Sequence, residues 1–174
     1  MTAFGKRFRL FLFLALDVAL ILAVVGFVQA RTDSPNQVVD RYLSVYSEAD
    51  MDGLLRLYSP EATFIDVSQR HEVSGTENLR AQFDDLAHKH QSMKVVEKRR
   101  AAKGNLVTIE VVYSGVLDCA ALGLPVGEVV EYEIPAVLLF EIEDGRIQHQ
   151  TDYLDFRTIA ELQQSLSAVA SAAK

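Results

Sequence analysis

Two aspartates occupy positions where a buried carboxyl group could act as a general acid or base. Asp66 lies near the end of a short β-forming run, 62–67, and Asp152 lies in a longer alternating run, 146–156. We expect both runs to turn these side chains toward one mostly apolar pocket. Desolvation and mutual repulsion would then raise at least one carboxyl pKa, which is the usual way to obtain a useful acid or base near neutral pH.

Further side chains are expected to share this pocket. Tyr42 follows the apolar face of a predicted helix, so its hydroxyl could serve as a hydrogen-bond donor to a developing oxyanion. Alternate residues of a strand point to the same face. On that basis Ala62 and Phe64 share the face of Asp66, and Gln148 and Gln150 share the face of Asp152. The predicted substrate-binding residues are Tyr132, Phe64 and Gln150.

A purely structural role is an alternative for each proposed catalytic residue. Asp66 could end its strand and hydrogen-bond the following loop. Asp152 could form an ion pair with Arg146 or Arg157 at the pocket rim. Tyr42 could be an ordinary core residue, with only its hydroxyl group reaching the pocket edge.

The histidines do not form a recognisable metal site. His88 and His90 are two residues apart and so cannot share a helical face, while His71 falls in a polar loop. His149 alternates away from Asp152. The sequence also lacks a nucleophile elbow, a phosphate-binding glycine loop and a zinc motif. We therefore predict chemistry without a metal or a cofactor.

The charge balance makes nucleic acid an improbable partner. The 174-residue chain has a formal charge of −7, and its first thirty residues carry three cations and one anion, which leaves −9 for the remainder. An acidic domain repels phosphate backbones. Cys119 is the single cysteine, so no intrachain disulfide can form. Residues 31–174 are long enough for one domain with its own core.

The first thirty residues have the pattern of a secretory signal. A short basic head precedes an apolar run, 10–28, and small residues then allow cleavage after Ala30. The run is also long enough to span a bilayer, so an uncleaved membrane anchor is the alternative. In both cases we expect the domain 31–174 to be exported, as a periplasmic or secreted protein or as one held outside the membrane by its anchor.

The elements that position these residues predict an α+β domain. Ser34 and Gln37 can form a capping box at a helix start, and Asp144-Gly145 is a common hairpin turn. Pro135 would be tolerated only at an edge or a bend. The expected helices are 35–48, 51–58, one opened by Thr76 and one opened by the Thr158–Glu161 capping box; the expected strands are 62–67, 92–102, 105–118, 127–142 and 146–156. A curved antiparallel sheet wrapped around helices would form a cone with a lined interior.

In this order of elements the sequence resembles the nuclear-transport-factor-2-like superfamily, and within it the SnoaL-like and ketosteroid-isomerase-like proteins. The resemblance covers residues 35–156. It rests on Arg41-Tyr42-Leu43, on 57–63 leading to Asp66, on Gly75, on 140–147 and on Asp152-Tyr153-Leu154-Asp155. It implies a cone-shaped sheet, a small hydrophobic ligand and a homodimer formed through the outer sheet face.

The resemblance also implies roles for single residues. Tyr42 and Asp66 correspond in type and place to the oxyanion donor and the general base of ketosteroid isomerases, while the second oxyanion donor would fall in the apolar stretch 136–138. Asp152 resembles the last aspartate of limonene-epoxide hydrolases. Their Arg-x-Asp pair is replaced here by Val111 and Tyr113.

Two functions follow from these observations. The first is an exported protein that binds a small hydrophobic molecule and works as an isomerase, cyclase or lyase, with Asp66 as base, Tyr42 as oxyanion donor and Asp152 as acid or polarising group. The second is a non-catalytic binding or assembly module of the same fold. An uncleaved anchor and an apolar outer sheet face would favour the second.

Overall fold

The computed structural model describes residues 33–122 and 129–172. The predicted signal peptide or anchor, 1–30, lies outside the described residues. Within the described ranges, every helix is too short or too polar to cross a lipid bilayer.

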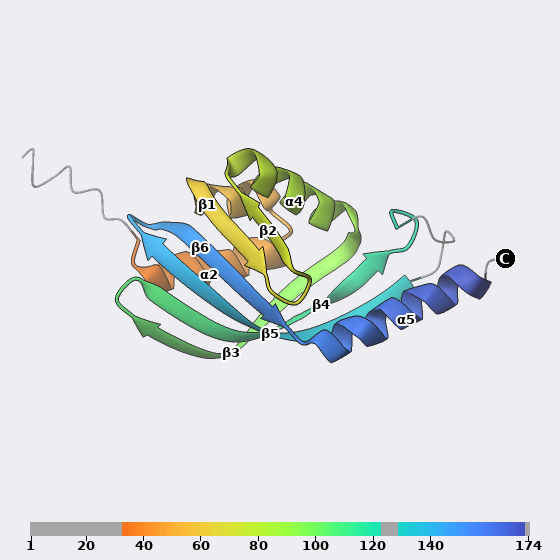
Figure 1. Cartoon of the computed structure of the whole chain (residues 1–174). Coiled ribbons are helices and arrows are strands. Elements are labelled where there is room, and N and C mark those ends of the chain that lie inside the picture. The colour runs from red at the N-terminus through yellow and green to blue at the C-terminus, as the bar shows by residue number, and fades with distance from the viewer. Residues whose placement is uncertain (1–32, 123–128, 173–174) are drawn as a thin grey trace, which may run out of the picture. The chain divides into compact units, whose positions relative to one another are not determined.

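The described residues form a six-stranded, strongly curved sheet that does not close into a barrel (Figure 1). Its strand order is β2-β1-β6-β5-β4-β3. β1 pairs in parallel with β6, and the other neighbours are antiparallel. The strands are β1 (Tyr58–Asp66), β2 (His71–Ser74), β3 (His90–Lys103), β4 (Leu106–Asp118), β5 (Val129–Glu143) and β6 (Arg146–Leu154). This architecture confirms the predicted fold class and the four-strand meander.

Helices supply the second layer. α2 packs against β3, β4 and β5, α4 packs against β1, β2 and β3, and α5 packs against β5. The helices are α2 (Pro35–Ser47), α3 (Met51–Arg56), α4 (Thr76–His88) and α5 (Phe156–Ala172). The apolar faces of α2, α3 and α4 and the inner face of the sheet enclose the larger core cluster, in which Phe140, Leu138 and Ile109 are fully buried. Leu162 and Leu166 of α5 pack against a second, smaller cluster.

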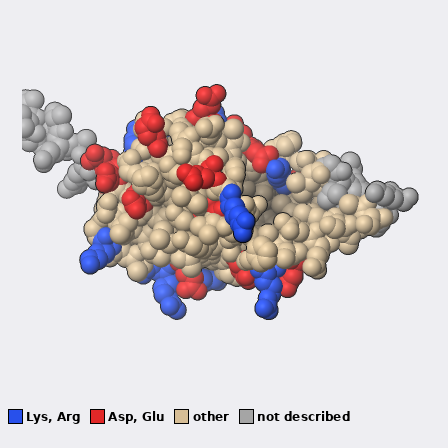
Figure 2. Space-filling model, in the orientation of Figure 1, with Lys and Arg blue, Asp and Glu red and all other residues tan. Residues whose placement is uncertain are grey.

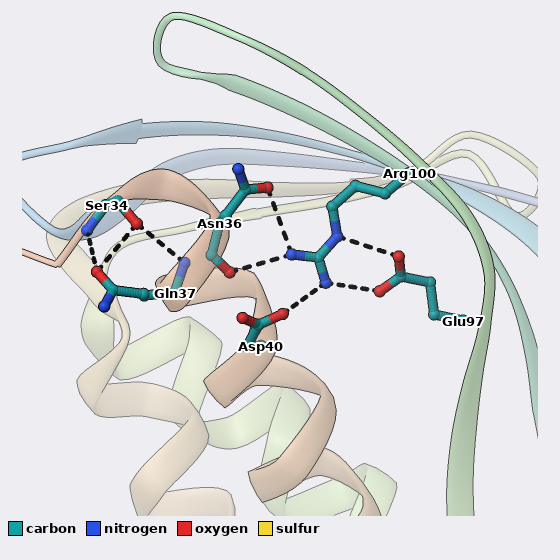
Figure 3. Close-up of polar contacts among 6 residues, drawn as sticks. All are labelled: Ser34, Asn36, Gln37, Asp40, Glu97 and Arg100. Atoms are coloured by element: carbon teal, nitrogen blue, oxygen red, sulfur yellow. Dashed lines mark hydrogen bonds and ion pairs between the residues drawn. The ribbon is translucent and has the colours of Figure 1, made fainter.

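The start of α2 is fixed to the sheet by a polar cluster around Arg100 of β3 (Figure 3). The predicted capping box is present, because Ser34 Oγ accepts from the Gln37 N–H and the Gln37 side chain reaches back to Ser34. Next to it, the Arg100 guanidinium forms ion pairs with Glu97 and Asp40 at 2.6 and 2.7 Å. It also donates to Asn36. Arg100 therefore sets where α2, the helix that carries Tyr42, lies on the sheet.

A β-bulge in β6 turns Gln148 away from the face that alternation predicted. The register of β6 against β5 passes from His149 to Ile147, which leaves Gln148 without a partner. Because the extra residue shifts the alternation by one, Gln148 does not share the inner face with Gln150 and Asp152, as alternation alone had predicted. Its amide donates instead to a carbonyl at the hairpin turn.

At Pro135, strand β5 is paired with β4 but not with β6. It lies opposite Val112 of β4, while pairing with β6 begins only at Ala136, opposite Leu154. The Pro135 carbonyl accepts the N–H of Asp155 at 2.9 Å, so this side of the residue faces the end of β6. Since the N–H and C=O of one strand residue point to the same side, the missing donor removes no bond from the β4 ladder.

Three local predictions were wrong. β2 was predicted as a polar loop, but it pairs with β1 at the sheet edge. Gly75, with φ 82°, is the N-cap of α4, whereas Thr76 is its first residue. α5 begins two residues before the predicted capping box, because the Asp155 carboxylate accepts from both the backbone N–H of Arg157 and the hydroxyl of Thr158.

Candidate functional site

A cavity of about 480 Å³ lies between the inner face of the sheet and helices α2, α3 and α4. This is the size range of pockets that enclose small organic ligands. Much of its wall is apolar and includes Leu54, Phe64, Phe83, Leu86, Ile134 and Leu154. On the surface, acidic and basic side chains are interspersed over the face drawn in Figure 2, without a large patch of either sign. Shape and burial, rather than a strong surface field, therefore distinguish the cavity.

The two aspartates predicted from the sequence meet in this cavity. Asp66 and Asp152 are direct partners in the parallel register of β1 and β6, so their side chains lie next to each other on the inner face. Both line the cavity, and they are only 6% and 4% exposed. Neither forms an ion pair with any arginine of the described residues, so the alternative pairing of Asp152 with Arg146 or Arg157 is wrong.

Burial raises the pKa of Asp152 to about 8. The pKa of about 8 is the balance of burial and the negative charge of Asp66, which raise it, against hydrogen bonds from Gln150 and Tyr113, which lower it. Gln150 Nε2 donates to Asp152 Oδ1 at 2.7 Å. Because Oδ1 accepts this bond, the proton of the neutral acid resides on Oδ2. Asp152 is therefore a carboxylic acid with a donor O–H at neutral pH.

Gln150 holds the polar groups behind the cavity together, and its side chain is not part of the cavity wall. It is fully buried. Its Oε1 accepts the hydroxyl of Tyr58, and its Nε2 donates to Tyr42 as well as to Asp152. Both amide hydrogens are thus in use. These contacts give Gln150 a positioning role behind the wall, and its direct contact with a substrate stays a prediction.

Tyr42 and Tyr113 form a buried hydroxyl pair beside Asp152. Their hydroxyl oxygens are 3.0 Å apart, and both rings line the cavity. The pair has two hydroxyl hydrogens: their mutual bond uses one, and the bond from Tyr113 to Asp152 uses the other. Gln150 donates to Tyr42 and so uses none. Burial raises the pKa of both tyrosines, which keeps them protonated as donors.

Asp66 is held by the turn that follows β1. Its Oδ1 accepts the backbone N–H of Gln69 at 3.1 Å, and its Oδ2 accepts the Gln69 side-chain amide at 3.0 Å. The predicted structural role, a strand-end bond to the following loop, is therefore confirmed. Each carboxylate oxygen can accept two bonds, so the same contacts orient Asp66 in the cavity without exhausting its lone pairs.

Sequence reasoning missed several wall residues, among them Tyr113 and His90. Tyr113 could have been found as the only polar side chain among the inward-facing residues at the centre of β4. His90 was assigned to the end of a helix, but it begins β3 and packs edge-on against Tyr132 with ring centroids 5.3 Å apart. Phe64 and Tyr132, predicted as substrate-binding residues, both line the cavity. Among the described residues, no group of three or more His, Cys, Asp and Glu side chains is arranged to hold a metal ion.

Comparison with protein families finds one matching model, described as a SnoaL-like domain, over residues 39–150. The match spans well over half of the chain and includes all but two of the residues that line the cavity, Asp152 and Leu154. The chain belongs to the SnoaL-like domain family. A search of curated proteins finds no match.

Solved structures show the same fold as this SnoaL-like chain. A proposed SnoaL-like polyketide cyclase from Shewanella denitrificans has a TM-score of 0.67 at 20% identity, covering 75% of this chain and 97% of that one. A protein of ketosteroid-isomerase-like fold from Catenulispora acidiphila, solved with trimethylamine, has 0.61 at 18%, covering 72% and 90%. An epoxide hydrolase of M. tuberculosis has 0.61 at 16%, covering 80% and 96%. At these identities the likeness establishes the fold of the SnoaL-like domain alone.

Proposed function

We propose that this SnoaL-like domain binds a small, mostly apolar ketone-like molecule and catalyses proton transfer on it without a cofactor. The observation that carries the proposal is the pair of adjacent buried carboxyls, of which Asp152 keeps its proton at neutral pH because burial raises its pKa to about 8. Two carboxyls in different protonation states can act as acid and base in the same site.

The reaction step follows from the positions of the protons. Asp66 takes a proton from the carbon next to the substrate carbonyl, and the electron pair of that C–H bond becomes the new C=C bond. Asp152 gives its Oδ2 proton to the carbonyl oxygen, which completes a neutral enol. The paired hydroxyl groups of Tyr42 and Tyr113, which line the cavity, stabilise the charge that develops on this oxygen. Return of the proton to another carbon would give isomerisation, and attack of the enol on a second carbonyl would give cyclisation.

Names given to solved structures of this fold are compatible with such chemistry. They include SnoaL-like polyketide cyclases and a ketosteroid isomerase. Those activities belong to those proteins, and here they support only the substrate class, a small molecule with an activated C–H bond. The predicted export of the domain is likewise a proposal, which a fractionation of cells expressing the full chain would test.

The test is exchange of the α-hydrogens of benzylacetone for deuterium in D₂O, followed by proton NMR. The full chain should accelerate this exchange, and the rate should fall as pH rises above about 8, where Asp152 loses its proton. Asp66→Asn and Asp152→Asn should each reduce the catalysed rate at least about tenfold. Asp84→Asn, which changes an exposed carboxyl on α4, is the matched control and should have no effect. Exchange at the buffer rate, or equal rates in all four proteins, would contradict the proposal.

One observation favours the second function, an assembly module. On the outer face of the sheet, Val137 and Tyr153 are cross-strand partners, and both are exposed together with Leu139. Adjacent exposed apolar side chains are typical of protein contact sites. We propose that this outer patch is the contact of a homodimer, an arrangement that does not exclude a catalytic cavity on the other face.

A further inference from the structure

His90 is a histidine of the cavity wall whose protonation pattern follows from its hydrogen bond. Its Nδ1 lies 2.6 Å from the carbonyl oxygen of Leu86, one turn earlier at the end of α4. A carbonyl oxygen can only accept a hydrogen bond, so Nδ1 carries a hydrogen. A neutral imidazole has a single N–H, and Nε2 is therefore left with a lone pair.

The Nε2 atom is available to a ligand. Within residues 33–122 and 129–172, Nε2 has no hydrogen-bond partner. It is also not one of the completely buried side-chain atoms that lack a partner. The ring itself borders the cavity beside Tyr132. An acceptor without a partner in a mostly apolar wall favours a ligand that brings a donor to it.

Burial keeps this imidazole neutral near neutral pH. Burial lowers the pKa of His90 below its ordinary value of 6.5, and the nearby ammonium of Lys89 lowers it further. The Leu86 carbonyl and Asp85 raise it, but Asp85 is itself engaged by Lys89 at 2.6 Å. Tyr132, which faces the ring from β5, stays protonated because burial raises its pKa to about 12.

His90 and the carboxyl pair lie in different parts of the cavity. Asp152 is opposite Leu138 of β5, whereas His90 packs on Tyr132, six residues earlier in the same strand. Six residues of a strand span roughly 20 Å, although curvature and the long side chains reduce the distance between the reactive atoms. The two polar sites are therefore suited to groups at opposite ends of one ligand.

We propose that Nε2 of His90 accepts a hydrogen bond from a hydroxyl group of the ligand, so that the cavity selects a ketone that carries a hydroxyl at its far end. This inference rests on the proposed function in treating the cavity as a ketone site. It adds the requirement for a second, donating oxygen. His90 is here a specificity-determining residue that takes no part in the proton transfer.

The probes are para-hydroxybenzylacetone and para-methoxybenzylacetone, which differ only in whether the distal oxygen can donate. Their dissociation constants for the full chain are measured at pH 7.5 by NMR titration. We expect the hydroxyl compound to bind about fivefold more tightly, the usual value of one hydrogen bond. As pH falls through the lowered pKa of His90, Nε2 gains a proton and becomes a donor, so the methoxy oxygen can accept and the ratio should fall toward one.

His90→Asn is the informative variant, because its side-chain amide can still donate to Leu86 while the Nε2 acceptor is gone. It should abolish the preference for the hydroxyl compound and leave the affinity for the methoxy compound nearly unchanged. His88→Asn, at an exposed position of α4, is the control and should keep the preference. In the wild type, the Nε2 nitrogen signal of His90 should shift on titration with the hydroxyl compound.

Each outcome separates the two proposals. Equal affinities for both ketones in the wild type, or an unchanged preference in His90→Asn, would overturn the role of His90 and leave the proton-transfer proposal standing. A preference that depends on His90, without any deuterium exchange, would support the binding site and overturn the proton transfer. Failure of both ketones to bind would overturn both.

Discussion

At the scale of the residue, Asp152 links the candidate chemistry to the stability of the protein. Its pKa is about 8 in the folded protein, against 3.8 for an exposed aspartate. The folded state thus holds this proton more tightly than the unfolded state. The stabilisation is fully present below pH 3.8 and is lost as pH rises through about 8, at about 1.4 kcal/mol for each unit of pKa difference.

Asp152→Asn should remove this part of the pH dependence. Asparagine imitates the neutral acid, since its oxygen can accept from Gln150 and its amide can donate as the Oδ2 hydroxyl does. We expect the variant to match the wild type near pH 4 and to be more stable at pH 9, by on the order of a few kcal/mol. Urea unfolding at both pH values measures the difference. A wild type and variant with parallel pH profiles would show that Asp152 is solvated and not protonated.

Residue types alone predicted part of the site. Asp66, Asp152 and Tyr42 could be placed because strand and helix periodicity decide which face a side chain occupies. Tyr113 and His90 escaped prediction, because their roles depend on which atoms meet across the cavity, and that is a property of the packed sheet and α4. Gln150 was placed correctly on the inner face, but only the three-dimensional contacts show that it lies behind the wall.

At the scale of the element, the position of α2 depends on Arg100. Arg100→Ala leaves the carboxylates of Glu97 and Asp40 close together without their shared cation, and it removes the bonds to Asn36. We expect a loss of about 1–2 kcal/mol in the free energy of unfolding. Because α2 carries Tyr42, the affinity for benzylacetone should fall as well.

Arg99→Ala is the matched control for that substitution. The side chain of Arg99 is 82% exposed, against 20% for Arg100, and its single ion pair is long at 3.7 Å. An exposed pair of this kind contributes between about 0 and 1 kcal/mol. Thermal or urea unfolding measures the loss of stability in both variants. Equal losses would mean that the Arg100 cluster contributes no more than a surface ion pair.

Gly115 permits the close approach of β3, β4 and the Tyr132 side chain. A Cβ atom at this position would overlap the backbone oxygen of Ser92 and the hydroxyl of Tyr132. Gly115→Ala should therefore cost about 1–3 kcal/mol and move the Tyr132 ring into or away from the cavity. Ser114→Ala, next to it in β4, is the comparison. Ligand titration and urea unfolding report the two effects, and wild-type behaviour in both would refute the overlap.

Element boundaries show where sequence patterns are informative and where they are not. The capping box at Ser34 predicted the start of α2 correctly, because all of its partners are local in sequence. Local patterns misplaced the starts of α4 and α5, where Gly75 and Asp155 act as caps instead of the nearby threonines. β2 could not be predicted, since an exposed four-residue edge strand is specified by its partner β1 more than by its own residues.

At the scale of the whole molecule, the outer patch of Val137, Leu139 and Tyr153 should control the oligomeric state. Tyr153→Lys together with Leu139→Lys would place two charges in a dimer contact, where their desolvation is unfavourable. We expect residues 31–174 to sediment as a dimer, and the double variant to sediment as a monomer. Val67→Lys, an exposed apolar position outside the patch, should leave the dimer intact. A monomeric wild type would contradict the proposal.

Because β1 pairs in parallel with β6, we expect the carboxyl site to form late in folding. Hairpins of the meander from β3 to β6 can form between neighbours in the chain, whereas β1 must find a strand that follows it by most of the domain's length. Contacts so distant in sequence are slow to form. Before that closure, Asp152 has neither the burial nor the Asp66 neighbour that raise its pKa. A carboxyl that titrates near pH 8 therefore reports that the two ends of the domain have joined, and it can be used to time that event during refolding.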